Sequence, residues 1–394
     1  MTSLPFSAVE TQLGMLIRNA TIVTPIGERV GDCLIRDGKI VALGAGISAE
    51  NAPIIDAERN YLCAGFIDLQ CNGGFGHDFT HDPRTIWEVA RQLPQFGVTS
   101  FLPTIITSPL DVVERARHVI KQASPSNFPQ RGRDLSAIPL GLHVEGPYLN
   151  PLKKGAHSAE HLRQPSVDEV ADWRPETGVR LVTLAPELPN ADAVIGQLAQ
   201  NGVIVSAGHS MATFDQASHA FNVGVRYGTH LFNAMPALHH RKPGLAAALL
   251  ADERATVGII PDGVHVHPDL VKLVWRMAKG RINVVTDAMA AMGCAEGVYQ
   301  LGEQGVRVDA TSARLADGTL AGSIVTLDQA LRNLWRWTNC SVPDAIRTIT
   351  QIPADLLGLA HKGRVDVGCD ADLVLLDKKL RIQQTIIGGV PVKV

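Results

Sequence analysis

Four acidic or histidine residues each close a short apolar segment in the middle of the chain: Glu145, His209, His230 and Asp287. Glutamate and two histidines are a suitable ligand set for a borderline divalent metal, and Asp287 is then a fourth polar group of the same site. Taken singly, such a residue is more often a hydrogen-bonded or capping residue at a strand end. The metal interpretation therefore depends on whether the fold brings all four together.

The elements around these residues indicate a (β/α)8 barrel, because eight apolar runs typical of strands alternate largely with helical patterns. In such a barrel the carboxyl ends of the strands meet at one mouth, where the chemistry takes place. An open doubly wound sheet is the alternative, although no G-x-G-x-x-G follows the first run. The predicted strands lie at about 66–70, 98–103, 139–145, 180–185, 203–208, 225–230, 256–260 and 282–287.

Both ends of the chain are rich in strand-forming residues and poor in helical patterns. MLIRNATIVT and CLIRDGKIVAL lie near the N-terminus, with Asp37-Gly38 as a hairpin turn signal, and residues 362–394 have the same character. We therefore expect the two ends to pair. The predicted division is an N-terminal extension at 1–14, a small β domain from 15–64 plus 356–394, and the barrel from 65–355.

The composition of the 394-residue chain argues against several classes of protein and of binding partner. A net charge of −3 gives no reason to expect nucleic acid or an anionic membrane surface. The six cysteines form no C-x-x-C pair, which favours reduced thiols over a disulfide framework. The first residues lack the basic start and apolar run of a signal peptide, and no apolar segment of about 20 residues would span a membrane. We expect a cytoplasmic protein.

The first predicted strand ends in Gln70-Cys71-Asn72, at the place where many metal-dependent hydrolases carry His-x-His. Two amides cannot replace two imidazoles as strong metal ligands. They can hydrogen-bond a water at the position that a second metal would otherwise take. Three ligands on other strands suffice for one open site with water in the fourth position. The sequence therefore predicts one metal per chain.

Three loops at the expected mouth carry further candidates. His157, in the loop after the third strand, can hydrogen-bond a substrate carbonyl, or it can be a solvated loop histidine. In THLFNAMPALHHRKPG, Arg241 can hold a phosphate and Asn233-Ala234 can offer backbone N–H groups, or the segment can be a solvated basic loop. In PDGVHVHP, His265 and His267 point opposite ways, so we expect only one of them to face the site.

Seven segments carry a family resemblance: GFIDLQCNG, GLHVEGPYLNPLKKGAH, VSAGHSMAT, GTHLFNAMPALHHRKPG, DGVHVHP, VVTDAMAAMG and GTLAGS. In order and spacing they resemble the N-acetylglucosamine-6-phosphate deacetylase family of the amidohydrolase superfamily, from about residue 15 to the C-terminus. The resemblance implies a distorted (β/α)8 barrel, a small β-sandwich built from both chain ends, and a homodimer. Members with Gln-x-Asn on the first strand resemble one-metal enzymes. VRLVTLAPE ends at Glu187, so a carbamylated lysine bridge has no candidate there.

The resemblance also implies roles for individual residues. Asp287 matches the catalytic acid/base, and His157 matches the residue that helps to polarise the acetyl carbonyl. The arginine that matches Arg241 can reach across the dimer interface, so the partner subunit can supply this contact. The implied metal ligands are Glu145, His209 and His230, and the implied phosphate and sugar contacts are Asn233, Ala234, Arg241 and His265.

The expected reaction is metal-dependent hydrolysis of N-acetyl-D-glucosamine 6-phosphate to D-glucosamine 6-phosphate and acetate. One divalent metal per subunit is expected, Zn²⁺ first, with Fe²⁺, Co²⁺ or Mn²⁺ as alternatives. A deacetylase for another N-acetylhexosamine 6-phosphate, such as the galactosamine epimer, or another amidohydrolase stays open. The alternative from a different class is a non-catalytic sugar-phosphate-binding or regulatory protein. The intact set of Glu145, His209, His230 and Asp287 argues against that class.

Overall fold

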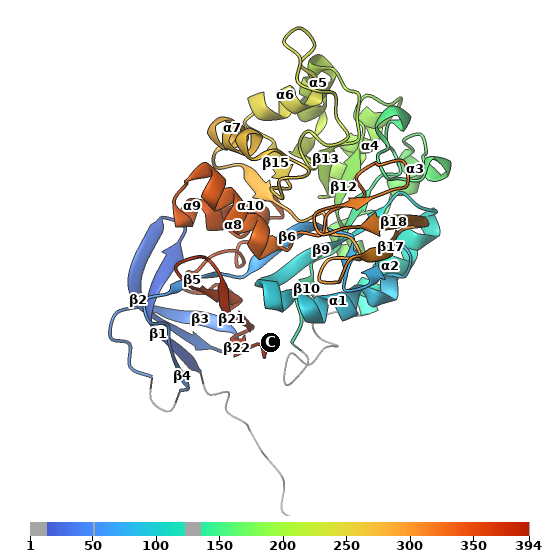
Figure 1. Cartoon of the computed structure of the whole chain (residues 1–394). Coiled ribbons are helices and arrows are strands. Elements are labelled where there is room, and N and C mark those ends of the chain that lie inside the picture. The colour runs from blue at the N-terminus through green and yellow to red at the C-terminus, as the bar shows by residue number, and fades with distance from the viewer. Residues whose placement is uncertain (1–13, 50–51, 123–134, 394) are drawn as a thin grey trace, which may run out of the picture.

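The computed structural model describes residues 14–49, 52–122 and 135–393. The predicted N-terminal extension at 1–14 lies outside these ranges, apart from Gly14. Two units are visible in Figure 1: a barrel, and a small β domain in which blue N-terminal strands lie beside red C-terminal ones. Among the described helices, none is long and apolar enough to cross a membrane.

The barrel consists of eight parallel strands, as the alternating pattern predicts. Neighbours pair in chain order, and the ladder from β9 to β16 is continuous. The first and last strands of the barrel approach each other where Cys71 forms a parallel bridge with Ala288, just beyond the last strand. The strands are β6 (Phe66–Cys71), β9 (Val98–Ile106), β11 (Leu142–Glu145), β12 (Val179–Leu184), β13 (Ile204–Ala207), β14 (Val225–Gly228), β15 (Thr256–Ile259) and β16 (Ile282–Val284).

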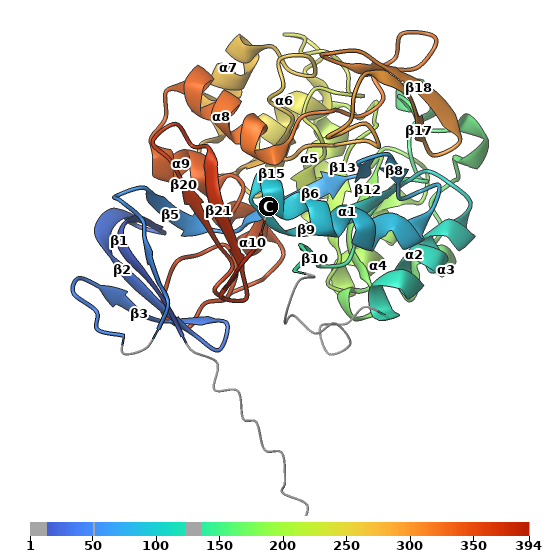
Figure 2. The same ribbon diagram turned by 60° about the horizontal axis from the view of Figure 1, so that its bottom comes forward.

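Helices surround the strands, and a three-stranded insert follows β16. The insert was not predicted from the sequence; Figures 1 and 2 show its hairpin on the side of the barrel remote from the small β domain. Its strands are β17 (Gly297–Leu301), β18 (Gln304–Val308) and β19 (Ala313–Arg314). The α-helices are α1 (Ile86–Gln92), α2 (Leu110–Gln122), α3 (Val167–Val170), α4 (Ala191–Gln200), α5 (Phe214–Val223), α6 (Gly244–Ala251), α7 (Pro268–Ala278), α8 (Leu327–Thr338), α9 (Val342–Arg347) and α10 (Gln351–Leu356).

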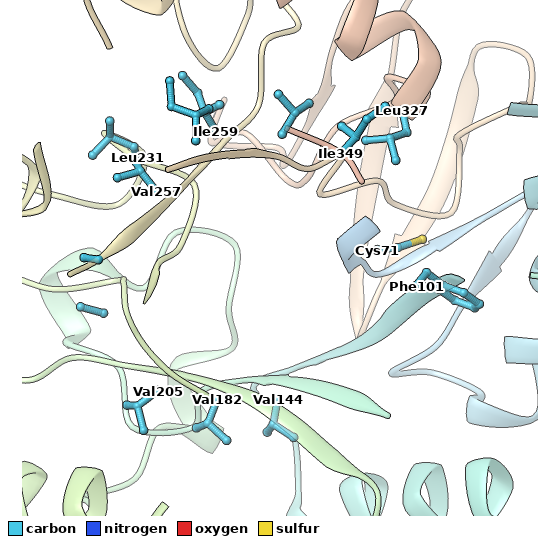
Figure 3. Packing of buried hydrophobic residues seen from close by; sticks show 14 of the residues in the cluster. Cys71, Phe101, Val144, Val182, Val205, Leu231, Val257, Ile259, Leu327 and Ile349 are labelled. Carbon is cyan, nitrogen blue, oxygen red and sulfur yellow. The ribbon is translucent and has the colours of Figure 1, made fainter. Parts of the chain in front are cut away.

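The alternation of side chains along each strand separates the core from the site. Val144, Val182 and Val205 lie on neighbouring strands and belong to the cluster between strands and helices; Figure 3 shows them pointing away from the barrel interior. Burying a valine stabilises the fold by roughly 1.5–3 kcal/mol. Since successive residues of a strand face opposite ways, Glu145 beside Val144 must face the interior. The apolar layer on one side of the strand thus orients the polar residue on the other.

The small β domain contains strands from both chain ends, as predicted. β5 joins the halves, because it pairs with β1 in parallel and with β20 antiparallel. The hairpin signal Asp37-Gly38 forms the turn between β2 and β3, with both residues at positive φ. The domain boundaries at 64/65 and 355/356 stay predictions. The strands are β1 (Met15–Thr24), β2 (Gly27–Arg36), β3 (Lys39–Gly44), β4 (Ile54–Asp56), β5 (Tyr61–Ala64), β20 (Leu373–Leu376), β21 (Ile382–Ile387) and β22 (Val390–Pro391).

Candidate active site

Most of the predicted site residues meet around one cavity of about 510 Å³, at the carboxyl ends of the barrel strands. This is where a barrel of this type gathers its chemistry. The predicted residues that line the cavity are Asn72, Glu145, His157, His209, His230, Asn233, Ala234, His265 and Asp287.

Three of these residues converge on one point. Glu145 Oε1 lies 3.0 Å from His230 Nε2 and 3.2 Å from His209 Nε2, and the two imidazole nitrogens lie 3.0 Å apart. All three side chains are buried. Burial alone would raise the pKa of Glu145, but the two histidines at 3.0 and 3.2 Å hold it well below its usual range. Glu145 is therefore a buried carboxylate that stays ionised.

The tautomer of His209 follows from its other ring nitrogen. Nδ1 lies 2.8 Å from the carbonyl oxygen of Lys153, which can only accept a hydrogen bond. Nδ1 must therefore carry the proton, and in the neutral ring Nε2 presents a lone pair to Glu145 and His230. Lone pairs and a carboxylate oxygen repel each other unless a cation lies between them. A backbone carbonyl that accepts from the far ring nitrogen, and so fixes the tautomer, is typical of a metal-bound histidine.

The residues fit a divalent metal. Ligands at about 2.0–2.2 Å from a tetrahedral ion lie roughly 3.3–3.6 Å from one another, and the separations of 3.0–3.2 Å among Glu145, His209 and His230 are slightly shorter than this. A second grouping, Glu145, His157 and His209, offers ligand atoms within 4.8 Å of one another. His157 and His230 are thus alternatives for the third ligand. The hydrogen bonds of His157 make it the weaker of the two.

His157 presents a proton, not a lone pair, to the cavity. Its Nδ1 accepts a hydrogen bond of 3.2 Å from the backbone N–H of Thr107, which can only donate, and lies 2.9 Å from the Thr107 hydroxyl, which can donate to the same atom. In the neutral ring Nε2 then carries the proton, and it lies 3.8 Å from Glu145 Oε2. Burial lowers the pKa of His157 to about 3, so the ring is neutral at pH 7. His157 is thus a buried hydrogen-bond donor at the site.

Gln70 and Asn72 contact Asp287. Asn72 Nδ2 donates a hydrogen bond of 2.7 Å to Asp287 Oδ1, and Gln70 Nε2 donates to the same atom at 3.0 Å and to Glu145 Oε1 at 3.1 Å. The amide oxygens of Gln70 and Asn72 are buried and have no hydrogen-bond partner among the described residues. The Gln-x-Asn pair therefore links the two carboxylates of the site.

The environment of Asp287 suits an acid/base. Burial, with the negative charge of Glu145 adding to it, raises the pKa of Asp287 to about 6. A group with a pKa near the working pH can both accept and release a proton. Its backbone N–H donates to the carbonyl of Gln70 at 2.8 Å, which fixes it against β6.

Several site residues have the left-handed backbone conformation that side chains other than glycine rarely adopt. φ is 48° at His209, 29° at His230, 51° at Ala234 and 49° at Asp287. Such conformations cost of order 1–3 kcal/mol each and cluster at functional sites. Three of the four, His209, His230 and Asp287, lie two or three residues after the end of a barrel strand, so the turn away from the strand aims these side chains into the mouth.

The predicted phosphate contacts divide into two groups. Asn233, Ala234 and His265 line the cavity. Arg241 is exposed, donates a hydrogen bond to His240, and is not among the described residues that line the cavity. His267 caps the N-terminus of α7 while His265 faces the site, as their i, i+2 spacing predicts.

Sequence reasoning missed the contribution of the insert and of the segment after it. Leu301 and Arg314 come from the insert, and Thr319 and Leu320 from GTLAGS, a motif to which no role was assigned. Glu187, noted only as a strand end, accepts hydrogen bonds from Asn150, Ser210 and the backbone of Met211, and so ties down the loop after His209.

A parallel barrel with carboxylates and histidines converging at the carboxyl ends of its strands has the architecture of an amidohydrolase. The model of the amidohydrolase family matches residues 61–392. The N-acetylglucosamine-6-phosphate deacetylase of Lysinibacillus sphaericus is 36% identical over 391 residues, which are 96% of this chain and 97% of the relative. The chain therefore belongs to the amidohydrolase family and, within it, to the N-acetylglucosamine-6-phosphate deacetylases.

Solved structures agree with this assignment. The N-acetylglucosamine-6-phosphate deacetylase of Pasteurella multocida superposes with a TM-score of 0.88 at 31% identity, covering 96% of this chain and 99% of that one. A mutant of the Mycobacterium smegmatis enzyme in complex with N-acetyl-D-glucosamine-6-phosphate gives 0.87 at 33% identity, covering 96% and 100%. The predicted fold, a (β/α)8 barrel with a small β domain from both chain ends, is confirmed.

Proposed function

We propose that this chain hydrolyses N-acetyl-D-glucosamine 6-phosphate to D-glucosamine 6-phosphate and acetate. The observation that carries the proposal is the convergence of Glu145, His209 and His230 on one point, with Asp287 in the same cavity. The relatives named above carry this substrate in their names, and one of them was solved with it.

We assign Glu145, His209 and His230 as ligands of one divalent metal per subunit. When bound, such a metal lowers the pKa of a coordinated water and acts as a Lewis acid toward a carbonyl oxygen. Zn²⁺ suits one carboxylate and two imidazoles best, with Fe²⁺, Co²⁺ and Mn²⁺ as alternatives. His157 is excluded from the ligand set because its Nε2 carries a proton.

We assign Asp287 as the acid/base. Its carboxylate would take a proton from the attacking water and pass it to the nitrogen of the sugar as the amide bond breaks, a role that typically contributes about 10²–10⁴-fold. Gln70 and Asn72 hold one oxygen of the carboxylate, which leaves the other oxygen for the proton. Fixing the acid/base in one orientation lowers the entropic cost of the step.

We assign His157 as the donor to the acetyl carbonyl. Its Nε2–H is held by the bond from Thr107 to Nδ1, and its low pKa keeps the ring a neutral donor through the reaction. A preorganised donor stabilises the negative charge that develops on the oxygen in the tetrahedral transition state.

The phosphate would lie at the side of the cavity formed by Asn233, Ala234 and His265, remote from the reacting bond. Binding energy gained there fixes the acetamide against the catalytic groups. Arg241 would complete this contact from the partner subunit of a homodimer, since it is exposed on its own subunit. A cytoplasmic location stays a prediction.

Acetate release from a panel of substrates tests the proposal. The enzyme with its metal is assayed with the 6-phosphates of N-acetylglucosamine, N-acetylgalactosamine and N-acetylmannosamine, and with plain N-acetylglucosamine. We expect the highest kcat/KM with N-acetylglucosamine 6-phosphate. A higher value for another epimer would assign a different deacetylase, and no acetate from any substrate, despite a stoichiometric metal, would favour a binding protein.

A further inference from the structure

Asp262 lies behind His265, in the loop between β15 and α7. Its Oδ2 is 2.6 Å from His265 Nδ1, and both side chains are buried, with 9% and 6% of their surface exposed. The other oxygen, Oδ1, accepts hydrogen bonds from the backbone N–H groups of Val264 and His265, at 2.8 and 2.7 Å. His265 lines the cavity, whereas Asp262 is not among the described residues that do.

The hydrogen bonds of Asp262 determine the proton positions in this pair. Both backbone groups are donors, so Oδ1 must be an acceptor. Burial would raise the pKa of Asp262, but the hydrogen bonds and charge of His265 and the backbone bonds hold it below its usual value. With Asp262 ionised, Nδ1 of His265 must donate. The Nε2 atom is then the free end of the ring.

A phosphate ester needs such a partner. Its oxygens only accept hydrogen bonds, and a charged donor binds them more strongly than a neutral one. Asp262 at Nδ1 and a phosphate at Nε2 would both accept hydrogen bonds, so the ring between them would carry a proton on each nitrogen. The charge of His265 also acts on Asp287, whose pKa it lowers against the effect of burial.

We propose that Asp262 is a positioning residue for phosphate recognition: it fixes His265 as the Nδ1–H tautomer and lets Nε2 donate, as an imidazolium, to the phosphate of the substrate. The inference rests on the proposed function, because it takes the phosphate to lie against His265. It extends that function by assigning a residue that does not contact the substrate.

The substitution Asp262→Asn tests the inference. Asparagine keeps Oδ1 as acceptor for the two backbone N–H groups, but turns an NH₂ group toward Nδ1. The ring must then accept there, so Nε2 keeps a proton but donates to the phosphate as a neutral group. A neutral donor contributes roughly tenfold less to binding than a charged one, so we expect KM for the phosphorylated sugar to rise by about that factor while kcat falls much less. The inhibition constant of inorganic phosphate should rise in parallel.

Two comparisons separate this role from a structural one. Asp269→Asn, an exposed aspartate that pairs with Lys272 on α7, is the matched control and should leave both constants unchanged. In a His265→Ala background, Asp262→Asn should add less than about twofold, since interacting residues are non-additive. An unchanged KM in Asp262→Asn, or the same increase in the His265→Ala background, would overturn the inference.

The readouts also distinguish this inference from the proposed function. If the wild-type protein releases no acetate from the phosphorylated sugar, the proposed function fails. The dissociation constant of inorganic phosphate, measured by calorimetry for the four variants of the cycle, still tests the pair. Equal phosphate affinity in the wild type and Asp262→Asn would then count against it.

Discussion

Asn72 and Asp287 are joined by a hydrogen bond of 2.7 Å from Nδ2 to Oδ1, across the point where the barrel closes. Their backbones meet there as well, because Asn72 N donates to the carbonyl of Ala288 at 2.7 Å. Asn72, at the end of the first barrel strand, thus holds Asp287, which follows the eighth. In place of two imidazoles, Gln70 and Asn72 supply amide N–H groups that orient the carboxylate of Asp287, the proposed acid/base.

Replacing Asn72 by alanine should lower kcat while leaving the metal in place. The loss of one hydrogen bond to a charged group costs about 1.5–3 kcal/mol, or roughly 10- to 100-fold in rate if the bond is made in the transition state. KM should change little, because Asn72 holds Asp287 and not the phosphate. Steady-state kinetics and metal analysis of Asn72→Ala check this. Asn222→Ala, an exposed asparagine bonded to Arg254, is the control; equal kinetics in the two variants would exclude the role.

Asp287→Asn should abolish most of the turnover and keep the fold. The amide has the size of the carboxylate but cannot take a proton from water, and general acid–base catalysis contributes about 10²–10⁴-fold. We expect kcat to fall by at least that factor with metal content and melting temperature nearly unchanged. Turnover within tenfold of wild type would show that another group carries the proton.

The metal content should be one ion per chain. In the proposed site, Glu145, His209 and His230 would hold one ion with an open position, and the amides of Gln70 and Asn72 are weak ligands for a second ion. Elemental analysis of protein purified without added metal tests the number. Chelation should remove activity, and stoichiometric Zn²⁺ should restore it. Two bound ions per chain would contradict the arrangement.

His209→Ala and His230→Ala should each lose most of the metal, whereas His219→Ala should retain it. His219 is an exposed histidine paired with Asp192, so it controls for the loss of an imidazole elsewhere on the barrel. His157→Ala should also retain the metal, since its Nε2 carries a proton, and should lower kcat. Loss of metal in His157→Ala would make His157 a ligand.

The barrel was predictable from the sequence because its strands are buried on both faces. Such strands appear as continuous apolar runs, and their polar last residues stand out against them. This is how Glu145 and Asp287 were found, although 142 residues separate them. The insert at 297–314 was missed because its strands are not continuous apolar runs and do not end in polar residues that stand out. Its hairpin is largely exposed and does not continue the alternation of strand and helix.

The proton positions and hydrogen-bond partners of the site residues were less predictable from the sequence than the identity of these residues. The protons of His209 and His157 are set by a carbonyl of Lys153 and a backbone N–H of Thr107. Backbone groups are the same at every position, so no residue type signals them. The contact between Asn72 and Asp287 depends on barrel closure, a long-range property. Asp262 could have been found, because an aspartate three residues before a histidine favours a turn that bonds both.

Arg241 allows a test of the dimer that does not depend on a crystal. It is exposed in its own subunit, and we propose that it reaches the phosphate of the partner's substrate. Arg241→Ala should then raise KM for the phosphorylated sugar with little effect on kcat, and should reduce the preference over plain N-acetylglucosamine. Arg84→Ala, an exposed arginine paired with Asp82, is the control and should behave as wild type.

Mixing two defective proteins decides which subunit supplies the arginine. The purified Arg241→Ala and Asp287→Asn proteins are mixed with each other and allowed to exchange subunits. If Arg241 acts across the interface, a mixed dimer has one site with both defects and one with neither, so activity at low substrate should recover to about a quarter of wild type when exchange is complete. If Arg241 acts within its own subunit, every site keeps one defect and mixing restores nothing. If light scattering shows a monomer, there is no partner subunit, and the proposal that Arg241 acts across an interface is wrong.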